Sequence, residues 1–168
     1  AASDVYKRQP KRILLLYNPI EPDFFNIGKQ KLEKTSLDLK SKMLRLLYVG
    51  RLVKLKGVQK LVEWFPEIKK EFRNVRLDIV GSGPLEYPLR MKVRKLKLQD
   101  QVFIHGFVPY ENLLKFYKEA DIFVTASYWE SFCLPVAEAA AAATPSVVRS
   151  VYALKDHVEL GYAVDYHE

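Results

Sequence analysis

Residues 44–57, LRLLYVGRLVKLKG, place a short apolar run directly before a basic loop that begins and ends in glycine. The run at 44–49 does not alternate between apolar and polar residues, which is typical of a strand buried on both faces. After the loop, apolar residues recur at helical spacing from 58 to 65. The segment therefore predicts a buried strand, a loop and a helix that Pro66 should kink or restart.

The same order of strand and helix recurs along the rest of the chain. Short apolar runs predict further strands at 75–80, 101–105, 121–125 and 146–149. Helical patterns between them predict a basic helix that carries Leu85, Leu89, Val93 and Leu96, a second helix at 110–119 and an alanine-rich third at 135–143. Such alternation builds right-handed βαβ units, so we expect an α/β fold, a Rossmann-like, doubly wound parallel sheet with helices on both faces.

The composition bounds the class of protein. The 168 residues fit one domain of ordinary size, and 49% of them are apolar, which is enough to fill a core. No run approaches the ~18 apolar residues of a membrane-spanning helix, and no signal peptide is visible. One cysteine excludes an internal disulfide, and three scattered histidines exclude a structural zinc cage. We therefore predict a soluble, cytoplasmic protein without a bound metal.

The charge balance favours an anionic partner. The chain has 27 Lys and Arg residues against 20 Asp and Glu residues, a net charge of +7. Nucleic acid, an acidic membrane surface and a phosphorylated small molecule all fit this charge. Many of the cations lie in the helix at 90–97, where no aromatic side chains interleave with them to stack on bases. This disfavours nucleic acid and leaves peripheral contact with a membrane open.

The loops that follow the strands form the candidate binding site, because ligands of open α/β sheets bind beyond the carboxyl ends of the strands. Three of these loops begin with glycine, at Gly50, Gly81 and Gly106, and glycine lets backbone approach a ligand closely. Arg51 and Lys56 share the first loop, beside a helix start, and such a pair suits a diphosphate. The alternative is a solvated basic loop.

Two carboxylates, Glu130 and Glu138, are separated by seven residues around a predicted helix start. Both can face one cleft, where a carboxylate accepts hydrogen bonds from two vicinal hydroxyls of a sugar. Glu138 lies in the apolar run 134–143, where an unpaired carboxylate would be costly to bury, so it favours a polar ligand. Two solvent-facing charges are the alternative.

The remaining reactive side chains are interpreted as structural. His105, His157 and His167 have no second ligand or acid partner at a meaningful spacing, so we interpret them as structural or exposed. Cys133 is interpreted as a small, buried, apolar residue.

With these positions in view, the chain resembles the C-terminal, donor-binding domain of the retaining GT-B glycosyltransferases of the family-4 type, the glycosyl transferases group 1. Several ordered motifs over residues 18–148 carry the resemblance. They are YVGRLVKLKG (48–57), LDIVGSGP (77–84), VFIHGFVP (102–109), LKFYKEADIFVTA (114–126), SYWESFCL (127–134) and EAAAAATPSVV (138–148).

The resemblance implies a nucleotide-diphosphate sugar as donor, whose hexosyl group is transferred with retention and without a metal or another cofactor. Arg51 and Lys56 would neutralise the diphosphate as it leaves. Glu130 would hold hydroxyls of the transferred sugar, and Glu138 the ribose. The other implied donor contacts are Gly50 and Gly81 by close approach, Phe107 and Val108 around the base, and Phe132, Cys133 and Leu134 through backbone N–H groups.

The resemblance also divides the chain. We expect residues 1–9 to be a non-native or disordered tail, and residues 10–43, polar and aperiodic, to be an arm or linker from an N-terminal acceptor-binding domain that this chain lacks. Residues 44–168 would form the nucleotide-sugar-binding domain, truncated at its C-terminus, because no helix covers the last strand. Such a half enzyme should turn over little substrate by itself.

Three features depart from the family pattern. The family commonly has Gly-Phe-Gly where this chain has Ser131-Phe132-Cys133, it commonly has glycine where Ala143 stands, and the glycine pair expected within 149–157 is missing. The alternative function is a non-catalytic, nucleotide-binding module of the same fold.

Overall fold

The computed structural model describes residues 18–33 and 43–166. In chain order its elements are α1 (Pro22–Glu33), β1 (Leu44–Val49), η2 (Lys54–Lys56), α2 (Val58–Glu71), β2 (Val75–Val80), α3 (Glu86–Lys95), β3 (Val102–Gly106), α4 (Tyr110–Glu119), β4 (Ile122–Val124), α5 (Leu134–Ala141), β5 (Ser146–Val148), α6 (Leu154–Glu159) and β6 (Ala163–Asp165). The strands at 44–49 and 75–80 and the helix at 110–119 have the predicted bounds. No helix in these two ranges is long and apolar enough to cross a membrane.

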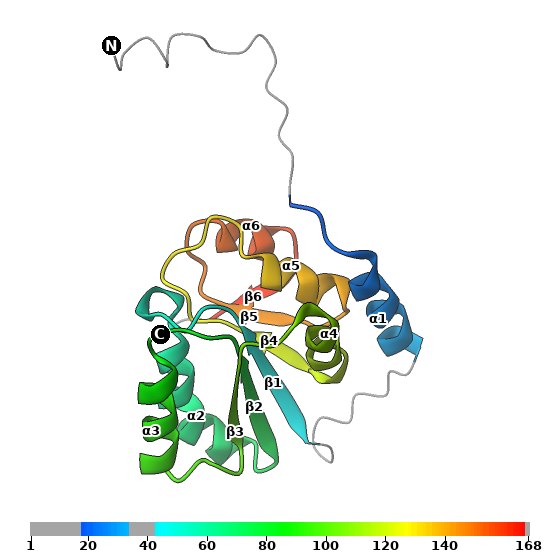
Figure 1. The fold of residues 1–168 in the computed structure, drawn as a ribbon. Helices are drawn as coiled ribbons and strands as arrows, with labels where there is room; N and C mark the ends of the chain where they lie inside the picture. The colour runs from blue at the N-terminus through cyan, green and yellow to red at the C-terminus, as the bar shows by residue number, and fades with distance from the viewer. Residues whose placement is uncertain (1–17, 34–42, 167–168) are drawn as a thin grey trace, which may run out of the picture.

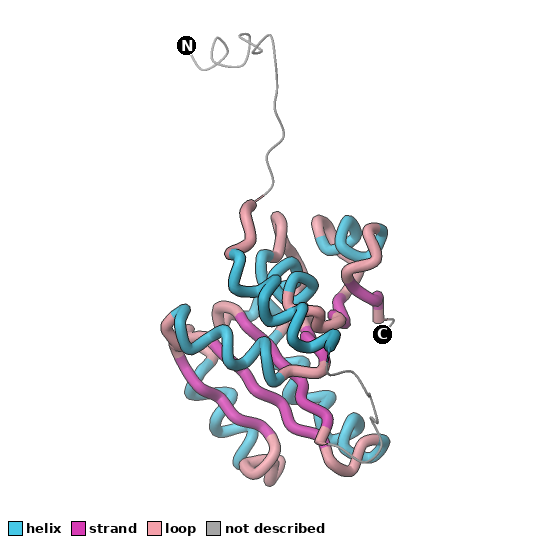
Figure 2. Tube along the Cα trace, turned by 90° about the vertical axis from the view of Figure 1, so that its right-hand side faces the viewer, coloured by secondary structure: helices cyan, strands magenta, loops and turns pink. Residues whose placement is uncertain are grey.

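The six strands form one sheet in the order β3-β2-β1-β4-β5-β6, and every neighbouring pair is parallel. The first strand, β1, lies inside the sheet. The chain adds β2 and then β3 on one side of β1, and then crosses to the other side of β1 for β4 (Figure 1). Figure 2 shows helices on both sides of the strands. The predicted α/β fold, a Rossmann-like, doubly wound parallel sheet, is confirmed.

Each face of the sheet has its own apolar core, which explains why the strand sequences do not alternate. On one face, Leu46 and Tyr48 of β1 pack with residues of α2 and α3. On the other, Leu47 packs with residues of α1, α4, α5 and α6. Burial at about 25 cal/mol per Å² of apolar surface therefore stabilises both faces of β1.

The helix after the first loop continues past its proline. α2 runs without interruption through Pro66 to Glu71, so the helix does not restart there. The apolar stripe of Val58, Leu61, Val62 and Phe65 is buried against the sheet and anchors the helix before the proline is reached.

No helix was predicted within the arm or linker at 10–43, but the structure has one at residues 22–33. α1 lies beside α4 and α5 (Figure 1). Phe24 is buried, and its ring meets the Tyr117 ring edge-on at 5.0 Å. Lys31 Nζ donates to the Ala120 carbonyl at 2.6 Å. Because Phe24 and Ile27 are the only apolar residues of α1 that are buried, the helical pattern in the sequence is weak. Residues 1–17 and 34–42 lie outside the described residues, so the interpretation of residues 1–9 as a tail stays a prediction.

The C-terminal region also contains more structure than predicted. α6 follows β5, and β6 adds a sixth strand that pairs with β5. The expectation that no helix follows the last predicted strand is therefore wrong. Leu154 anchors α6 in the core with no exposed surface, but a helix of six residues offers too few turns for a periodic pattern.

Candidate functional site

The first three strand-end loops are joined by backbone hydrogen bonds into one edge. Gly50 N donates to Val80 O at 3.0 Å, Leu52 N to Ser82 O at 2.9 Å, and Gly81 N to Gly106 O at 2.8 Å. A Cβ at position 81 would lie 1.9 Å from the Gly50 carbonyl oxygen. The predicted site residues Gly50 and Gly81 are thus in direct contact, and the packing of the two loops requires glycine at 81.

The loop after β4 is tied to the loop after β1. Tyr128 N and Ser127 Oγ both donate to Leu55 O, at 2.9 and 3.3 Å. Lys56 Nζ donates to Glu130 Oε2 at 2.6 Å, and the two side chains are only 18% and 9% exposed. Lys56 and Glu130, both predicted to belong to the candidate site, are therefore brought together as a largely buried ion pair. A charge pair with so little water around it holds its geometry strongly.

Arg51 stands beside this pair as an exposed cation. Its backbone carbonyl accepts a hydrogen bond from the buried Tyr48 hydroxyl at 3.0 Å, which fixes the loop at this residue. Its guanidinium has no ion-pair partner among residues 18–33 and 43–166. Arg51 is therefore a charge that an anion arriving at this edge could use.

Glu138 is half-buried on α5, and its protein partner was missed from the sequence. Tyr117 of α4 donates its hydroxyl proton to Glu138 Oε2 at 2.7 Å. Burial raises the pKa of Glu138, and the hydrogen bond from Tyr117 partly offsets this effect. A polar ligand is therefore not required to satisfy the carboxylate. Its partner is on α4, whereas the partner of Glu130 is on the loop after β1.

The start of α5 has an unusual backbone. Cys133 precedes the helix with φ 64° and ψ 66°, in the left-handed region. Burial, followed by the charge of Glu130, raises the pKa of the Cys133 thiol to about 12, so the thiol stays protonated at neutral pH. This agrees with the interpretation of Cys133 as a small buried residue. The N–H groups of Cys133 and Leu134 lie at the helix start, where no intrahelical acceptor exists.

The two residues predicted to flank a base differ in their surroundings. Phe107 is 77% exposed, whereas Val108 is half-buried and packs against the core on the α4 and α5 side. The structure therefore leaves an apolar ring in solvent at the end of β3.

Two of the three histidines lie within the described residues, and both have protein partners. His105 contacts Asp78 at 2.6 Å, and Arg76 donates two hydrogen bonds to the same carboxylate. Burial opposes ionisation, but the hydrogen bonds from His105 and Arg76 outweigh it and lower the pKa of Asp78. His105 is thus structural, and His157, discussed below, is buried. His167 lies outside the described residues.

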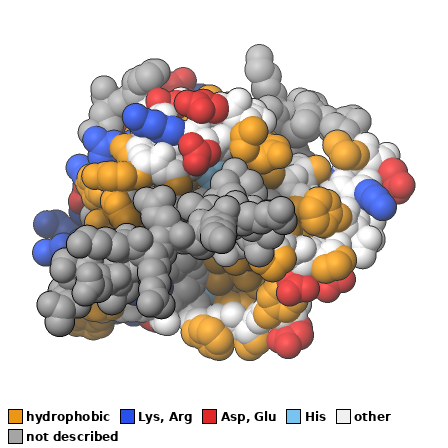
Figure 3. All heavy atoms as spheres, turned by 90° about the horizontal axis from the view of Figure 1, so that it is seen from above, with side chains coloured by type: hydrophobic (Ala, Val, Ile, Leu, Met, Phe, Trp, Pro, Cys, Tyr) orange, Lys and Arg blue, Asp and Glu red, His pale blue; other side chains and the backbone are white. Residues whose placement is uncertain are grey.

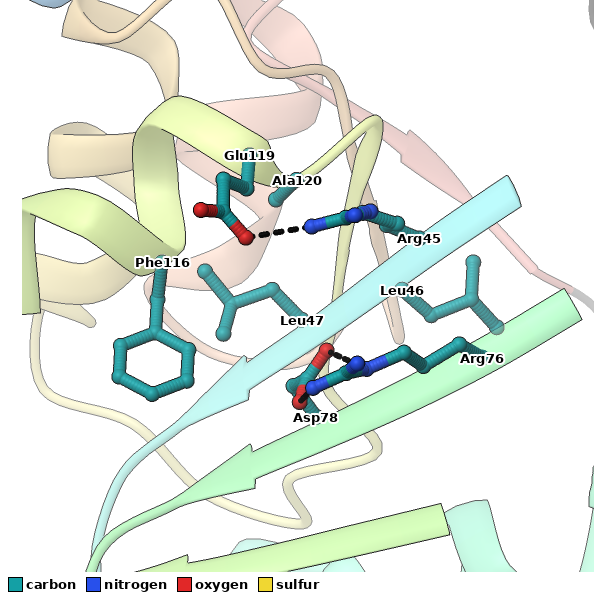
Figure 4. A pocket seen from close by; sticks show the side chains of 8 residues that line it. All are labelled: Arg45, Leu46, Leu47, Arg76, Asp78, Phe116, Glu119 and Ala120. Atoms are coloured by element: carbon teal, nitrogen blue, oxygen red, sulfur yellow. Dashed lines mark hydrogen bonds and ion pairs between the residues drawn. The ribbon is translucent and has the colours of Figure 1, made fainter. Parts of the chain in front are cut away.

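A small pocket lies near Asp78, between β1, β2 and the end of α4, and its lining is drawn in Figure 4. Arg45 and Arg76, the second residues of their strands, place it toward the amino-terminal edge of the sheet. Their charges are already paired, with Glu119 and Asp78 respectively. Because the candidate residues follow the strands at the opposite edge, this pocket is not part of the site. The described residues contain no group of three or more His, Cys, Asp or Glu side chains that could hold a metal ion.

Comparison with known proteins decides the family. The model of the family "Glycosyl transferases group 1" matches residues 29–164. The chain belongs to this family. A glycosyltransferase of Methanocaldococcus jannaschii without an assigned role is 33% identical over 159 residues, 92% of this chain and 40% of that protein. The chain therefore spans less than half the length of this relative.

Solved structures give the same fold. The glycosyltransferase WaaG, involved in lipopolysaccharide biosynthesis, aligns with a TM-score of 0.71 and 21% identity, over 96% of this chain and 45% of WaaG. The pneumococcal O-GlcNAc transferase GtfA, solved with UDP and GlcNAc, aligns with a TM-score of 0.61 and 28% identity, over 69% of this chain and 23% of GtfA. The sheet is thus one half of a GT-B fold.

Three residues at or near positions where the family pattern has glycine have a left-handed backbone. Cys133 has φ 64°, Ala143 has φ 51°, and Tyr152, within the loop where a glycine pair was expected, has φ 49°. Ser131, which also stands where the family has glycine, is not among the residues with positive φ. A side chain in the left-handed region costs roughly 1–2 kcal/mol relative to glycine. The three conformations are therefore held against a local cost, which the surrounding packing must offset.

Proposed function

We propose that this chain is the donor-binding part of a glycosyltransferase and binds a nucleoside-diphosphate sugar at the carboxyl edge of its sheet. The observation that carries the proposal is the buried Lys56–Glu130 pair beside the unpaired Arg51, at the joined ends of β1 and β4. The relative GtfA, solved with UDP and GlcNAc, supports a uridine nucleotide as the first donor to test.

In this proposal the diphosphate lies between the first loop and the start of α5. Arg51 and Lys56 would neutralise its charge, and Lys56, oriented by Glu130, would stabilise the charge that develops as the sugar leaves. Backbone N–H groups at Phe132, Cys133 and Leu134 would donate to phosphate oxygens. Glu138, held at Oε2 by Tyr117, would accept from the ribose through its other oxygen.

The sugar would lie against Glu130, whose carboxylate accepts hydrogen bonds from its hydroxyls. We propose hexosyl transfer with retention, with no cofactor, and with the acceptor held by a second domain of the full-length protein. The exposed ring of Phe107 lies at this edge, available to the base of the nucleotide or to that domain. The chain alone should be nearly inactive, because positioning the acceptor supplies much of the rate.

The direct test is calorimetric binding of UDP by the chain and by single variants. Arg51→Ala and Glu138→Ala should each weaken binding about 10-fold or more, since each removes a charge-assisted hydrogen bond worth ~1.5–3 kcal/mol. Arg51→Ala should leave the unfolding midpoint within a few degrees of the wild type. Glu138→Ala should lower it further, because the buried Tyr117 hydroxyl loses the carboxylate that accepts its hydrogen bond, but the domain should still fold. Lys54→Ala, which removes an exposed cation from the same loop, is the matched control and should bind UDP like the wild type.

The base and sugar can be found with a thermal-shift panel of UDP-, GDP- and ADP-sugars, because a ligand of the folded state raises the midpoint. Unchanged affinity in both Arg51→Ala and Glu138→Ala would sink the site assignment. A panel in which no nucleotide raises the midpoint would contradict the function itself.

A second proposal concerns peripheral contact with an anionic membrane through α3. Tyr87 and Met91, one helical turn apart, are 73% and 45% exposed. Arg90 and Lys92 are paired with Glu86 and Glu63. Arg94 and Lys95, by contrast, have no ion-pair partner within the described residues.

Lys and Arg side chains gather on the same side of the molecule in the space-filling view, the side on which Figure 1 places α3 (Figures 1 and 3). Exposed apolar side chains beside unpaired cations match an interfacial surface with anionic headgroups.

Sedimentation with vesicles tests this contact. The chain should cosediment with vesicles rich in anionic lipid at low salt and be released near 1 M salt, where the screening length is about 3 Å. Arg94→Glu combined with Lys95→Glu should abolish cosedimentation. The control, Lys69→Glu combined with Lys70→Glu on α2, changes the net charge equally and should still sediment. Equal behaviour of the two double variants would rule out α3 as the contact.

A further inference from the structure

His157 lies against the turn that starts α5, a contact that the sequence analysis did not predict. The residue is on α6 and only 5% exposed. Its Nε2 is 2.6 Å from the carbonyl oxygen of Phe132. Its ring also contacts the Phe132 ring at 5.4 Å and the Tyr162 ring at 6.4 Å between centroids. The imidazole is therefore fixed in direction by two aromatic rings and one hydrogen bond.

The direction of this hydrogen bond is set by chemistry. A carbonyl oxygen can only accept, so Nε2 must carry the hydrogen. Nδ1 is buried and has no hydrogen-bond partner among the described residues. The structure thus shows the His157 ring in one polar interaction, the hydrogen bond that Nε2 donates to the Phe132 carbonyl oxygen.

The Phe132 carbonyl belongs to the same rigid, planar peptide unit as the Cys133 N–H. In a trans peptide the two groups point in opposite directions, and the described chain has no cis peptide bond. Holding the carbonyl toward α6 therefore aims the Cys133 N–H away from α6. The backbone conformation of Cys133, with φ 64°, is unfavourable for a residue with a side chain. The turn therefore needs an anchor from outside the segment.

We propose that His157 is a positioning residue for the nucleoside diphosphate. It holds the Phe132–Cys133 peptide so that the N–H groups of Cys133 and Leu134 point at the phosphate. That a phosphate binds at this turn rests on the proposed function. That His157 anchors the turn rests on the structure alone. Glycine in place of Cys133 would adopt this turn without help. In this chain the histidine from α6 compensates for the missing glycine.

The test compares two replacements by calorimetry with UDP as the probe. His157→Phe keeps a ring between Phe132 and Tyr162 but removes the donor, and should weaken UDP binding about 10-fold. His157→Gln carries an amide N–H near the position of Nε2, and should stay within about 3-fold of the wild type. Leu154→Val, a buried change on the same helix that leaves the donor in place, should bind like the wild type.

Rescue by glutamine but not by phenylalanine supports the assignment, whereas equal UDP affinity of wild type and His157→Phe overturns it. If His157→Phe does not fold, His157→Asn replaces it, because its amide is one methylene too short to reach Phe132.

Hydrogen exchange of the amides of Phe132, Cys133, Leu134 and Val136 tests the anchor without any nucleotide. Faster exchange in His157→Phe than in His157→Gln supports the anchored turn, and equal exchange in both overturns it. If the wild type binds none of UDP, GDP and ADP but the two variants show this exchange difference, the proposed function is refuted and the anchor stays in place.

Discussion

Replacing Gly57 with alanine is expected to lower the free energy of unfolding by about 3 kcal/mol or more. Gly57 has φ 65°, and a Cβ there would lie 1.9 Å from the Ala126 carbonyl oxygen and 2.5 Å from its carbonyl carbon. The left-handed backbone costs a side chain about 1–2 kcal/mol, and forcing atoms into a packed region adds about 1–3 kcal/mol. Urea unfolding followed by far-ultraviolet circular dichroism measures the loss.

Gly161→Ala is the matched control, because it separates the two costs. Gly161 also has a left-handed backbone, φ 77°, but a Cβ there would meet no atom within 4 Å. This variant should lose only the conformational part, about 1 kcal/mol. Equal losses in the two variants would show that the contact between the first loop and Ala126 does not matter for stability. The contact is of interest because it holds together the loops that carry Lys56 and Glu130.

The elements predicted best from the sequence are those that local composition determines. β1 and β2 have the predicted bounds because a parallel strand buried on both faces needs a mainly apolar run that does not alternate, and both runs are six residues long. α1 was missed because two buried side chains, Phe24 and Ile27, are enough to hold a helix that is otherwise polar. β6 was missed because only Ala163 of its three residues is buried, so no apolar run marks the strand, and its partner β5 determines its conformation.

In the candidate site, too, the sequence predicted residues from local features but not their contacts with distant elements. Position after a strand end was sufficient to select Arg51, Lys56 and Glu130. The partners that position such groups were not visible, because each comes from a distant element. Tyr117 precedes its partner Glu138 by 21 residues, and His157 follows Phe132 by 25. Sequence spacing within one segment carries no information on such contacts, which only the fold creates.

The Lys56–Glu130 pair should be the most sensitive charged contact in the chain. Lys56→Met removes the cation and leaves the Glu130 carboxylate, only 9% exposed, without its partner. Breaking a buried pair from one side costs about 3–5 kcal/mol, and we expect about 3 kcal/mol here because Lys56 is partly exposed. The unfolding midpoint in urea should fall accordingly, with an unchanged slope.

A double-mutant cycle distinguishes this cost from the loss of the lysine itself. Lys56→Met combined with Glu130→Gln has no unpaired charge, so it should be about 2 kcal/mol more stable than the sum of the two single losses predicts. Lys60→Met is the control. It breaks the exposed pair with Glu63, whose atoms are 3.6 Å apart, and should change stability by about 0.5 kcal/mol or less. Strict additivity in the cycle would mean that the two side chains do not interact in solution. The proposed orientation of Lys56 toward the diphosphate would then lose its basis, since Glu130 is the group that holds it.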